Sequence, residues 1–315
     1  MDIFITTFEA VATLLFIGIV GFYMISRKVL PESAINILAV VTIDIALPAL
    51  VFVNIVMQFN PHAMPLWWHL PLYFFAFTAF AFVLAKLLSV LMLPKHKAEF
   101  TASLFYQNAV FFPLAIISGL NSSRSELMVK LFFFTLFFAP VYFSTVQFFF
   151  NDGKYKVDKS KIFNPILLAT IAGISVVFCG LSRFVPDFVN ESLMMVGKMS
   201  TPLLMLIFGG SMYLDYRDKG RIEFVEIVKF IIAKNLIFPA VMIGIIALFR
   251  PAYDVAFLLL LQAAVPPITS LSVMAKRYNG RTSMINQFLF SSFMISLLTI
   301  PLFMMLFEMI YGRIQ

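Results

Sequence analysis

Charged residues are scarce in this chain. Of its 315 residues only 12% are Asp, Glu, Lys or Arg, whereas 61% are hydrophobic and 39 are Phe. A soluble domain carries about 25% charged residues and about half apolar ones. The composition therefore predicts a polytopic integral membrane protein. One crossing of the hydrocarbon takes about 20 residues, so ten crossings would leave no room for a separate soluble domain.

Cysteine and histidine are also scarce, which excludes several kinds of site. The single cysteine, Cys179, rules out an intramolecular disulfide and a thiolate metal cluster. The three histidines, His62, His69 and His96, all fall in predicted loops, and there is no His-Glu-x-x-His motif. We therefore expect no metal centre, no cofactor and no enzymatic activity.

Ten apolar runs are long enough to cross a membrane. Each must be helical, because lipid cannot satisfy the polar groups of the backbone. The runs fall at about 4–25, 34–57, 66–92, 99–119, 127–150, 162–182, 191–214, 223–249, 254–275 and 283–310. The expected fold class is all-α, with ten transmembrane helices.

The distribution of Lys and Arg predicts the orientation in a cell membrane. The odd-numbered loops hold 14 of these cations, whereas the even-numbered loops and the two termini hold 5. Cytoplasmic loops carry the excess of Lys and Arg, so we expect both termini outside and the loop 151–161 inside. The net charge of +7 then reflects the excess of Lys and Arg in the loops expected to be cytoplasmic. The lipid bilayer is therefore an expected partner, and nucleic acid is not.

Two pairs of prolines indicate an internal duplication. Pro48 in span two and Pro202 in span seven are 154 residues apart, and Pro113 in span four and Pro267 in span nine have the same separation. Because five spans is an odd number, the second copy must enter the membrane from the opposite side. The predicted organisation is a first five-helix repeat over 1–150, a connecting loop over 151–161 and a second, inverted repeat over 162–315. Such inverted repeats with discontinuous helices are typical of secondary transporters with a midplane site.

Spans four and nine are expected to break at their prolines and to cross. Proline removes a backbone donor and clashes with the preceding turn, and the N-termini of the resulting half-helices favour an anion such as a carboxylate. The candidate substrate-binding residues lie around these breaks: Gln107, Asn108, Pro113, Gln262, Pro266, Pro267, Thr269 and Ser270. The alternative is that the amide and hydroxyl side chains only tie the broken helices together.

Three ionisable residues fall at mid-span, where a charge is costly and is a functional candidate by default. Asp44 and Lys198 occupy repeat-related positions, each one helical turn before its proline. They pair with each other, flank the substrate path or carry protons, with Asp44 the candidate proton carrier. Lys234 either satisfies carbonyl groups freed at a helix break or holds the place of a coupling cation. A purely structural role is the alternative for all three.

Several segments carry a resemblance to a known family. The most specific are QAAVPPITS at 262–270, MAKRYNG at 274–280 and SLLTIPL at 296–302, and the weaker ones are ALPALVF at 46–52, NP at 164–165, TPL at 201–203 and GGS at 209–211. Together they resemble the auxin efflux carrier family of membrane transporters, in the bile acid/sodium symporter-like superfamily. The chain departs from that family in span four, where FYQN at 105–108 replaces the usual Gly-Asn-Thr-Gly.

The resemblance implies a fold and a function. It implies ten helices in two inverted repeats, crossed broken helices in spans four and nine, and a scaffold of spans one, two, six and seven beside a mobile unit. It also implies elevator-type alternating access and carriage of a small organic anion: auxin in plant members, malate or malonate in some bacterial ones. A homodimer through the scaffold helices is a further expectation. The alternatives are a sodium-coupled carrier like the bile-acid symporters and a sensor that keeps the fold without pumping.

Overall fold

The computed structural model describes residues 2–119, 125–150, 165–217, 222–278 and 280–311. Within these ranges the chain is helical, and one isolated bridge is its only extended pairing. Seven helices are long and apolar enough to cross a membrane: Phe4–Ser26, Ser33–Gln58, His69–Leu91, Glu126–Phe150, Asp187–Leu214, Phe224–Phe249 and Thr282–Tyr311. The chain is therefore an all-helical, polytopic membrane protein.

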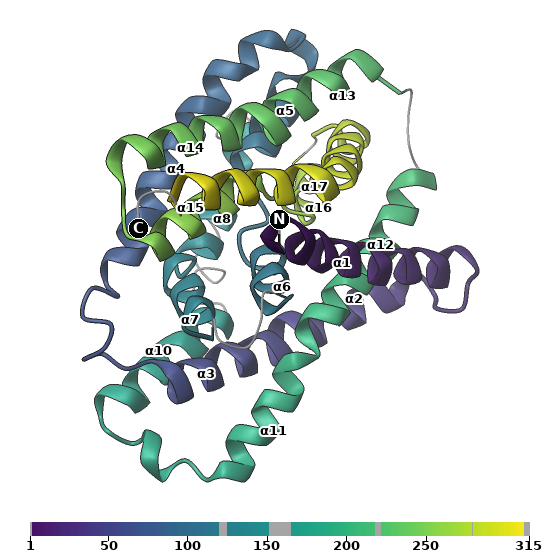
Figure 1. Cartoon of the computed structure of the whole chain (residues 1–315). Helices are drawn as coiled ribbons and strands as arrows, with labels where there is room; N and C mark the ends of the chain where they lie inside the picture. Colours follow the sequence, from purple (N-terminus) through teal and green to yellow (C-terminus); the bar gives the residue numbers. More distant parts are fainter. Residues whose placement is uncertain (1, 120–124, 151–164, 218–221, 279, 312–315) are drawn as a thin grey trace.

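The helices follow one another through short connections (Figure 1). The first half contains α1 (Asp2–Ser26), α2 (Ser33–Val40), the π-helix η1 (Val41–Ala46), α3 (Leu47–Gln58), α4 (His69–Leu88), α5 (Lys97–Phe105), α6 (Phe111–Gly119), α7 (Ser125–Phe134), α8 (Phe138–Thr145) and α9 (Gln147–Phe150). The second half contains α10 (Pro165–Phe178), α11 (Asp187–Lys198), α12 (Ser200–Arg217), α13 (Phe224–Ile231), the π-helix η7 (Ile232–Ile237), α14 (Phe238–Phe249), α15 (Tyr253–Ala264), α16 (Leu271–Arg277) and α17 (Thr282–Tyr311). The described residues also contain three short 3₁₀ turns: η2 (Ser89–Leu91), η3 (Pro94–His96) and η6 (Ser182–Phe184).

The observed helices follow the predicted apolar runs, with differences in runs five and six. Runs four and nine each divide into two half-helices, as expected. Run five also divides, between α7 and α8, which was not predicted. The division falls at residues 135–137, shortly before Pro140, which is the third residue of α8. Run six is seen only as α10, and the connecting loop 151–161 lies outside the described residues.

Span two continues through Pro48 without a break. The helix continues from α2 to α3 through the π-helix η1, in which the N–H of Leu47 bonds to the carbonyl of Thr42, five residues back. The wider turn accommodates the missing donor and the ring of Pro48 without breaking the helix. The same device precedes Pro239, where the N–H of Phe238 bonds to Ala233.

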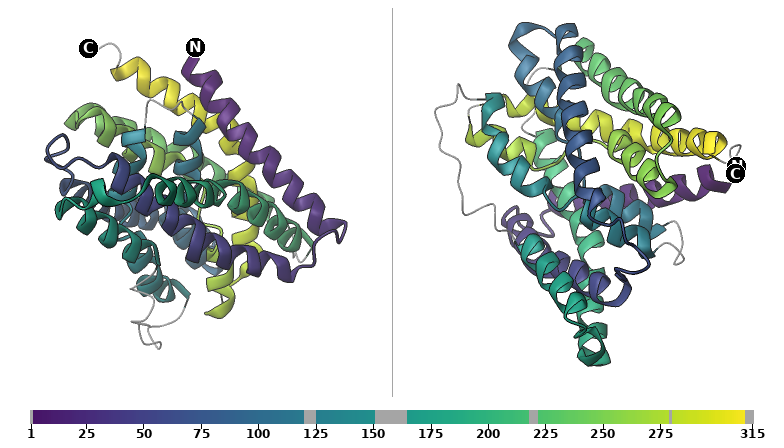
Figure 2. Two further views of the ribbon diagram at one scale, coloured as in Figure 1. Left: turned by 90° about the horizontal axis from the view of Figure 1, so that it is seen from below. Right: turned by 90° about the vertical axis from the view of Figure 1, so that its left-hand side faces the viewer.

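The helices form two layers (Figure 2). The first layer consists of α1 to α3 and α10 to α12, and its members contact one another extensively. Glycines allow α1 and α12 to approach closely: a Cβ atom on Gly209 would lie 1.7 Å from the carbonyl oxygen of Gly18, and one on Gly21 would lie 2.2 Å from that of Leu206. Small residues give membrane helices this close backbone contact in place of a hydrophobic driving force.

The second layer consists of α4 to α9 and α13 to α17, and aromatic side chains fill its interior. Phe100, Phe230 and Phe288 are fully buried, and the ring centroids of Phe230 and Phe288 are 4.3 Å apart. These contacts join α5, α13 and α17. The half-helices of spans four and nine are therefore held within one packed unit.

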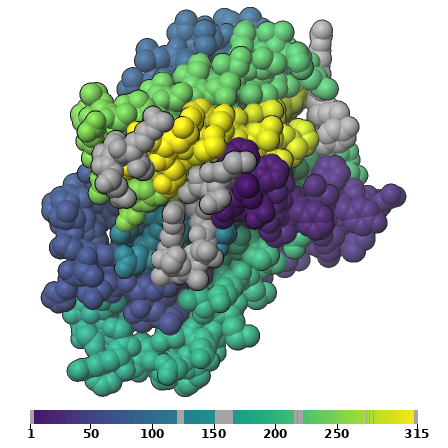
Figure 3. Space-filling view, viewed as in Figure 1, coloured from purple at the N-terminus to yellow at the C-terminus, as the bar shows by residue number. Residues whose placement is uncertain are grey.

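Apolar contacts join the two layers. The rings of Phe208 in α12 and Phe293 in α17 have centroids 4.1 Å apart, and a Cβ atom on Gly119 in α6 would lie 2.6 Å from the Cβ of Ala10 in α1. Figure 3 shows α17, in yellow, lying directly against α1, in purple. The interface therefore runs along α1 and α12 on one side and along α6 and α17 on the other.

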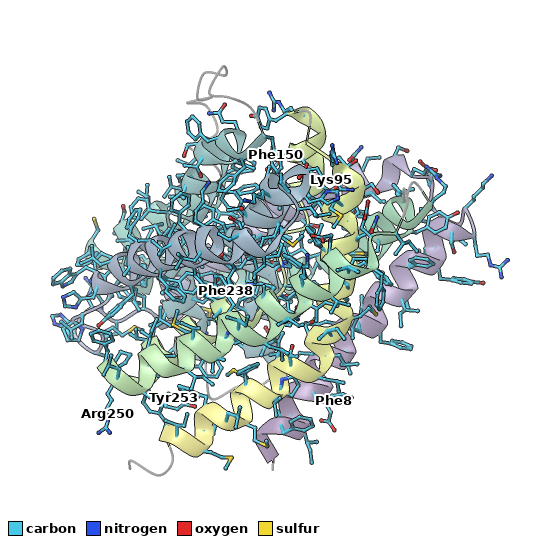
Figure 4. The ribbon with its side chains drawn as sticks, turned by 90° about the horizontal axis from the view of Figure 1, so that it is seen from above. Phe8, Lys95, Phe150, Phe238, Arg250 and Tyr253 are labelled. Atoms are coloured by element: carbon cyan, nitrogen blue, oxygen red, sulfur yellow. The ribbon has the colours of Figure 1, made fainter. Side chains whose placement is uncertain are left out.

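The two ends of the molecule carry different loops. Lys95 and Phe150, which flank loops predicted to be cytoplasmic, lie at one end, whereas Phe8, Arg250 and Tyr253 lie at the opposite end (Figure 4). The start of α1 and the end of α17 share that second end. This distribution agrees with the orientation predicted from the Lys and Arg count, in which the odd-numbered loops share one side of the membrane. The orientation itself stays a prediction.

Candidate functional site

The two broken helices meet at a crossing in the second layer. The interruption between α5 and α6 pairs with the one between α15 and α16 as a short antiparallel bridge between Gln107 and Pro267. The N–H of Asn108 donates to the carbonyl of Pro266 at 2.9 Å, and the N–H of Ile268 donates to that of Tyr106 at 2.9 Å. The prediction that spans four and nine break and meet is confirmed. Their depth in the bilayer stays a prediction.

The two interruptions have different local causes. In span nine, α15 ends at Ala264, and Pro266 and Pro267 follow directly, neither of which can donate a helical hydrogen bond. In span four the interruption precedes Pro113, which is the third residue of α6. The expected break at Pro113 is therefore displaced, because proline is tolerated in a first turn, where its missing N–H has no helical acceptor. The pairing across the crossing holds this second break open.

Amide side chains fix the crossing. The Nε2 of Gln262 donates to the carbonyl of Ala109 at 2.7 Å, and the Oδ1 of Asn108 accepts from the N–H of Phe112 at 3.4 Å, in the first turn of α6. Gln262, Asn108 and Gln107 are all buried. The side chain of Gln262 therefore ties the two broken helices together, and that of Asn108 caps α6, which is the structural role considered as the alternative; a role in substrate binding stays a prediction.

A cavity of about 570 Å³ opens beside the crossing, between the two layers. Three predicted residues line it: Asn108, Thr269 and Ser270. Gln107, Pro113, Gln262, Pro266 and Pro267 are not among its lining residues. The first layer contributes residues of α2, η1, α10 and α12, and the second contributes residues of α6, α7 and α8. Both half-helices α6 and α16 begin beside the cavity, so two positive dipole ends face this region.

The lining of the cavity is mostly apolar. Its aromatic members are Phe111, Phe132, Phe138, Tyr142 and Phe143. Glu32, at the start of α2, is the one charged residue among the described lining, and it forms an ion pair with Arg217. An apolar body with a small polar head group fits such a site.

Tyr142 is a site residue that the sequence analysis missed. Its hydroxyl accepts a hydrogen bond from the Oγ of Ser270 at 3.1 Å, and its ring lies edge-on to Tyr106 with centroids 4.9 Å apart. The hydroxyl groups of Tyr106 and Thr145 are 2.7 Å apart. The available signal was the spacing of Tyr142 and Thr145 three residues apart after Pro140, which places both on one face of a short helix.

Asp44 and Lys198 do not lie at the cavity. Both side chains are exposed on adjoining elements of the first layer, η1 and α11. Ile43 lines the cavity, but its neighbour Asp44 does not. Among the described residues neither charge forms an ion pair, so the expected pairing of Asp44 with Lys198 is not present in this conformation.

Lys234 lies inside the second layer. Its side chain is fully buried, and its Nζ donates to the carbonyl of Ala263 at 3.2 Å, in the last turn of α15. The neighbouring Asn235 is held by the carbonyl and the hydroxyl of Ser292, at 3.0 Å and 2.9 Å. Lys234 therefore contacts a carbonyl group beside a helix break, as one of its two expected roles requires, and its role in transport stays a prediction.

Comparison with known protein families identifies the family of this chain. A family described as membrane transport protein matches residues 6–304. No curated protein sequence matches the chain. The matched range takes in both layers, both broken helices and the cavity between them. The chain belongs to the auxin efflux carrier family of membrane transport proteins.

Proposed function

We propose that this protein is a secondary carrier that moves a small organic anion across the cell membrane by elevator-type alternating access. The observation that carries the proposal is the cavity beside the crossing of α5–α6 and α15–α16, which lies between two separately packed layers. In secondary transporters, substrate sites form where discontinuous helices meet, and alternating access moves one unit against the other. Here the second layer would carry the substrate along the first.

The proposed topology has ten spans in two inverted five-helix repeats, with both termini outside. The crossing of the fourth and ninth apolar runs and the placement of Lys95 and Arg250 at opposite ends support it. Single cysteines at these two positions, in a chain with Cys179 replaced by Ser, test the orientation. A membrane-impermeant maleimide added to intact cells should label Arg250→Cys and not Lys95→Cys. The reverse pattern would overturn the orientation.

The lining of the cavity favours a monoanion with an apolar body over a dicarboxylate. The amide of Asn108 and the hydroxyl groups of Thr269 and Tyr142 supply hydrogen bonds for one carboxylate, since Ser270 gives its own proton to Tyr142, whereas the remaining walls are largely aromatic and aliphatic. No lysine or arginine is among the described lining residues, so a second carboxylate would be desolvated without a counter-charge. Of the anions implied by the family, an auxin-like aryl acetate fits better than malate or malonate.

Counterflow in proteoliposomes tests the carrier function. Vesicles loaded with unlabelled indole-3-acetate should accumulate labelled indole-3-acetate transiently, and vesicles loaded with malonate should not. A sensor that keeps the fold would bind the anion without any exchange. Replacing sodium by choline on both sides should leave the rate unchanged, whereas a sodium-coupled carrier would lose exchange. Absence of counterflow with a panel of carboxylates would overturn the proposal.

We propose that the protein forms a homodimer through the exposed face of η1 and α11. Asp44 and Lys198 are exposed there on adjoining elements, and a charge facing lipid is costly. A two-fold interface would let each Asp44 meet the Lys198 of a second copy. Light scattering of the purified protein should give a dimer, and Asp44→Lys should shift it toward monomer. A wild-type monomer would remove the basis of this interface.

A further inference from the structure

Lys234 is a buried cation without a carboxylate partner among the described residues. Its side chain has no exposed surface, and its two described contacts are the carbonyl of Ala263, at 3.2 Å, and the face of Phe238, whose centroid lies 4.7 Å from Nζ. An unpaired charge in a low-dielectric interior is strongly unfavourable unless something compensates it. The group that compensates the charge of Lys234 is therefore expected to belong to the backbone.

The carbonyl end of α15 provides that compensation. A helix carries about half a unit of negative charge at its C-terminus, and α15 ends at Ala264, one residue after the group that Lys234 contacts. In secondary transporters the carbonyl ends of interrupted helices are the places where coupling cations bind. The ammonium group of Lys234 therefore stands at a position of that kind.

The surroundings hold Lys234 in this position. Lys234 lies in the π-helix η7, and the next residue, Asn235, forms reciprocal hydrogen bonds with Ser292 of α17. The hydroxyl of Thr299 also lies within 3.4 Å of the Asn235 amide. Two helices of the second layer are thereby fixed around one lysine, whose amine reaches a third helix, α15.

We propose that the ammonium group of Lys234 is a tethered substitute for a coupling cation. This inference deepens the proposed carrier function and rests on it for the role in transport. The tethered charge moves with the second layer, so no sodium ion needs to bind at the α15 carbonyl end. About half of its charge is offset by the helix end, and the remainder favours an anion in the adjacent cavity. Ala263, which Lys234 contacts, directly follows Gln262, whose side chain donates to the carbonyl of Ala109 in the cavity lining.

Chemical rescue of Lys234→Ala tests the cation position without any substrate. This substitution removes the atoms of an n-propylammonium group and leaves a space beside the carbonyl of Ala263. Adding n-propylammonium should raise the melting temperature of purified Lys234→Ala, whereas 1-propanol should not, and neither should affect the wild type. An equal response to both additives, or to neither, would overturn the tethered-cation role. If the variant does not fold, Lys234→Met provides the second measurement.

Lys234→Met keeps most of the packing and removes the charge, so it isolates the electrostatic effect on the substrate. The variant should bind indole-3-acetate about tenfold more weakly than the wild type and should bind the neutral indole-3-acetamide equally well. Lys86→Met is the matched control: Lys86 also stacks over a phenylalanine, Phe82, but is exposed near the end of α4. Equal loss for acid and amide would show a merely structural lysine.

The two measurements separate the inference from the proposed function. If n-propylammonium stabilises Lys234→Ala but the wild type shows no counterflow, the cation position stands and the carrier proposal fails. If the wild type exchanges indole-3-acetate and Lys234→Met binds acid and amide as the wild type does, the carrier proposal stands and the tethered cation fails.

Discussion

Gln262 and Ala109 join the two broken helices: the Nε2 of Gln262 donates to the carbonyl oxygen of Ala109 at 2.7 Å, and the glutamine is fully buried. The donor lies near the end of α15, and the acceptor lies in the interruption between α5 and α6. This bond fixes one broken helix against the other beside the cavity. The crossing is therefore held by a side chain as well as by its backbone bridge.

Substituting Gln262 by Leu should lower the stability of the protein. The change leaves the buried carbonyl of Ala109 without this partner, which costs about 1 to 3 kcal/mol. The melting temperature of the purified protein measures the effect. Gln58→Leu serves as the control, since Gln58 bonds only to Asn54 of its own helix, at 3.3 Å and partly exposed. Equal shifts for the two variants would contradict a special role for the crossing.

The sequence predicted the break in span nine well and the break in span four poorly. Adjacent prolines at 266 and 267 end a helix through local chemistry alone. In span four, residues 106–110 contain no proline, and the extended conformation of residues 106–108 depends on pairing with a segment about 160 residues away. The offset of Pro113 from Pro267 therefore identified the correct span but not the residues that form the interruption. Pairing between distant segments is invisible to a local pattern.

The cavity could not be predicted from the sequence for a related reason. Only Asn108, Thr269 and Ser270 of the candidate set line it. Most other lining residues come from the two layers facing each other, and Tyr142 is brought there by an unpredicted break in span five. The burial of Lys234 was predictable from its depth in an apolar run, whereas its acceptor depended on where α15 ends. The spacing of apolar residues along the chain predicts which face of each helix is buried, but it does not predict the angle at which two helices cross.

Substituting Gly209 by Ala should disrupt the first layer. A Cβ atom there would lie 1.7 Å from the carbonyl oxygen of Gly18, so α1 and α12 must separate. We expect a loss of about 3 kcal/mol or more in stability, at the upper end for overpacked sites. Gly244→Ala is the matched control, because nothing lies within 4 Å of a Cβ atom at that position. Thermal unfolding should show a large drop for the first variant and none for the second, and a stable Gly209→Ala protein would refute the tight packing.

Removing the hydroxyl group of Tyr142 should weaken anion binding. Tyr142→Phe leaves the ring in the cavity but takes away a hydroxyl that accepts from Ser270 and keeps its own O–H free to donate to a carboxylate. We expect about a threefold to tenfold loss of affinity for indole-3-acetate, measured by thermal shift across a concentration series. Tyr311→Phe removes a comparable hydrogen bond to the carbonyl of Pro251, away from the cavity, and should have no effect on binding. Unchanged affinity of Tyr142→Phe would exclude the hydroxyl from substrate recognition.

Neutralising Asp44 tests whether a proton is carried on the first layer. Its position in the middle of span two made Asp44 the candidate proton carrier. The side chain is, however, exposed outside the cavity, on the first layer, which would stay fixed during transport. A proton bound there would not travel with the substrate, so Asp44→Asn should leave the pH dependence of indole-3-acetate counterflow unchanged. Initial rates measured at a series of pH values provide the comparison, with Glu9→Gln on α1 as the control for loss of one carboxylate. A flattened pH profile in Asp44→Asn alone would instead show that this carboxylate binds a proton during transport. Lys234 would then not be the only ionisable residue that sets the charge balance of the cycle.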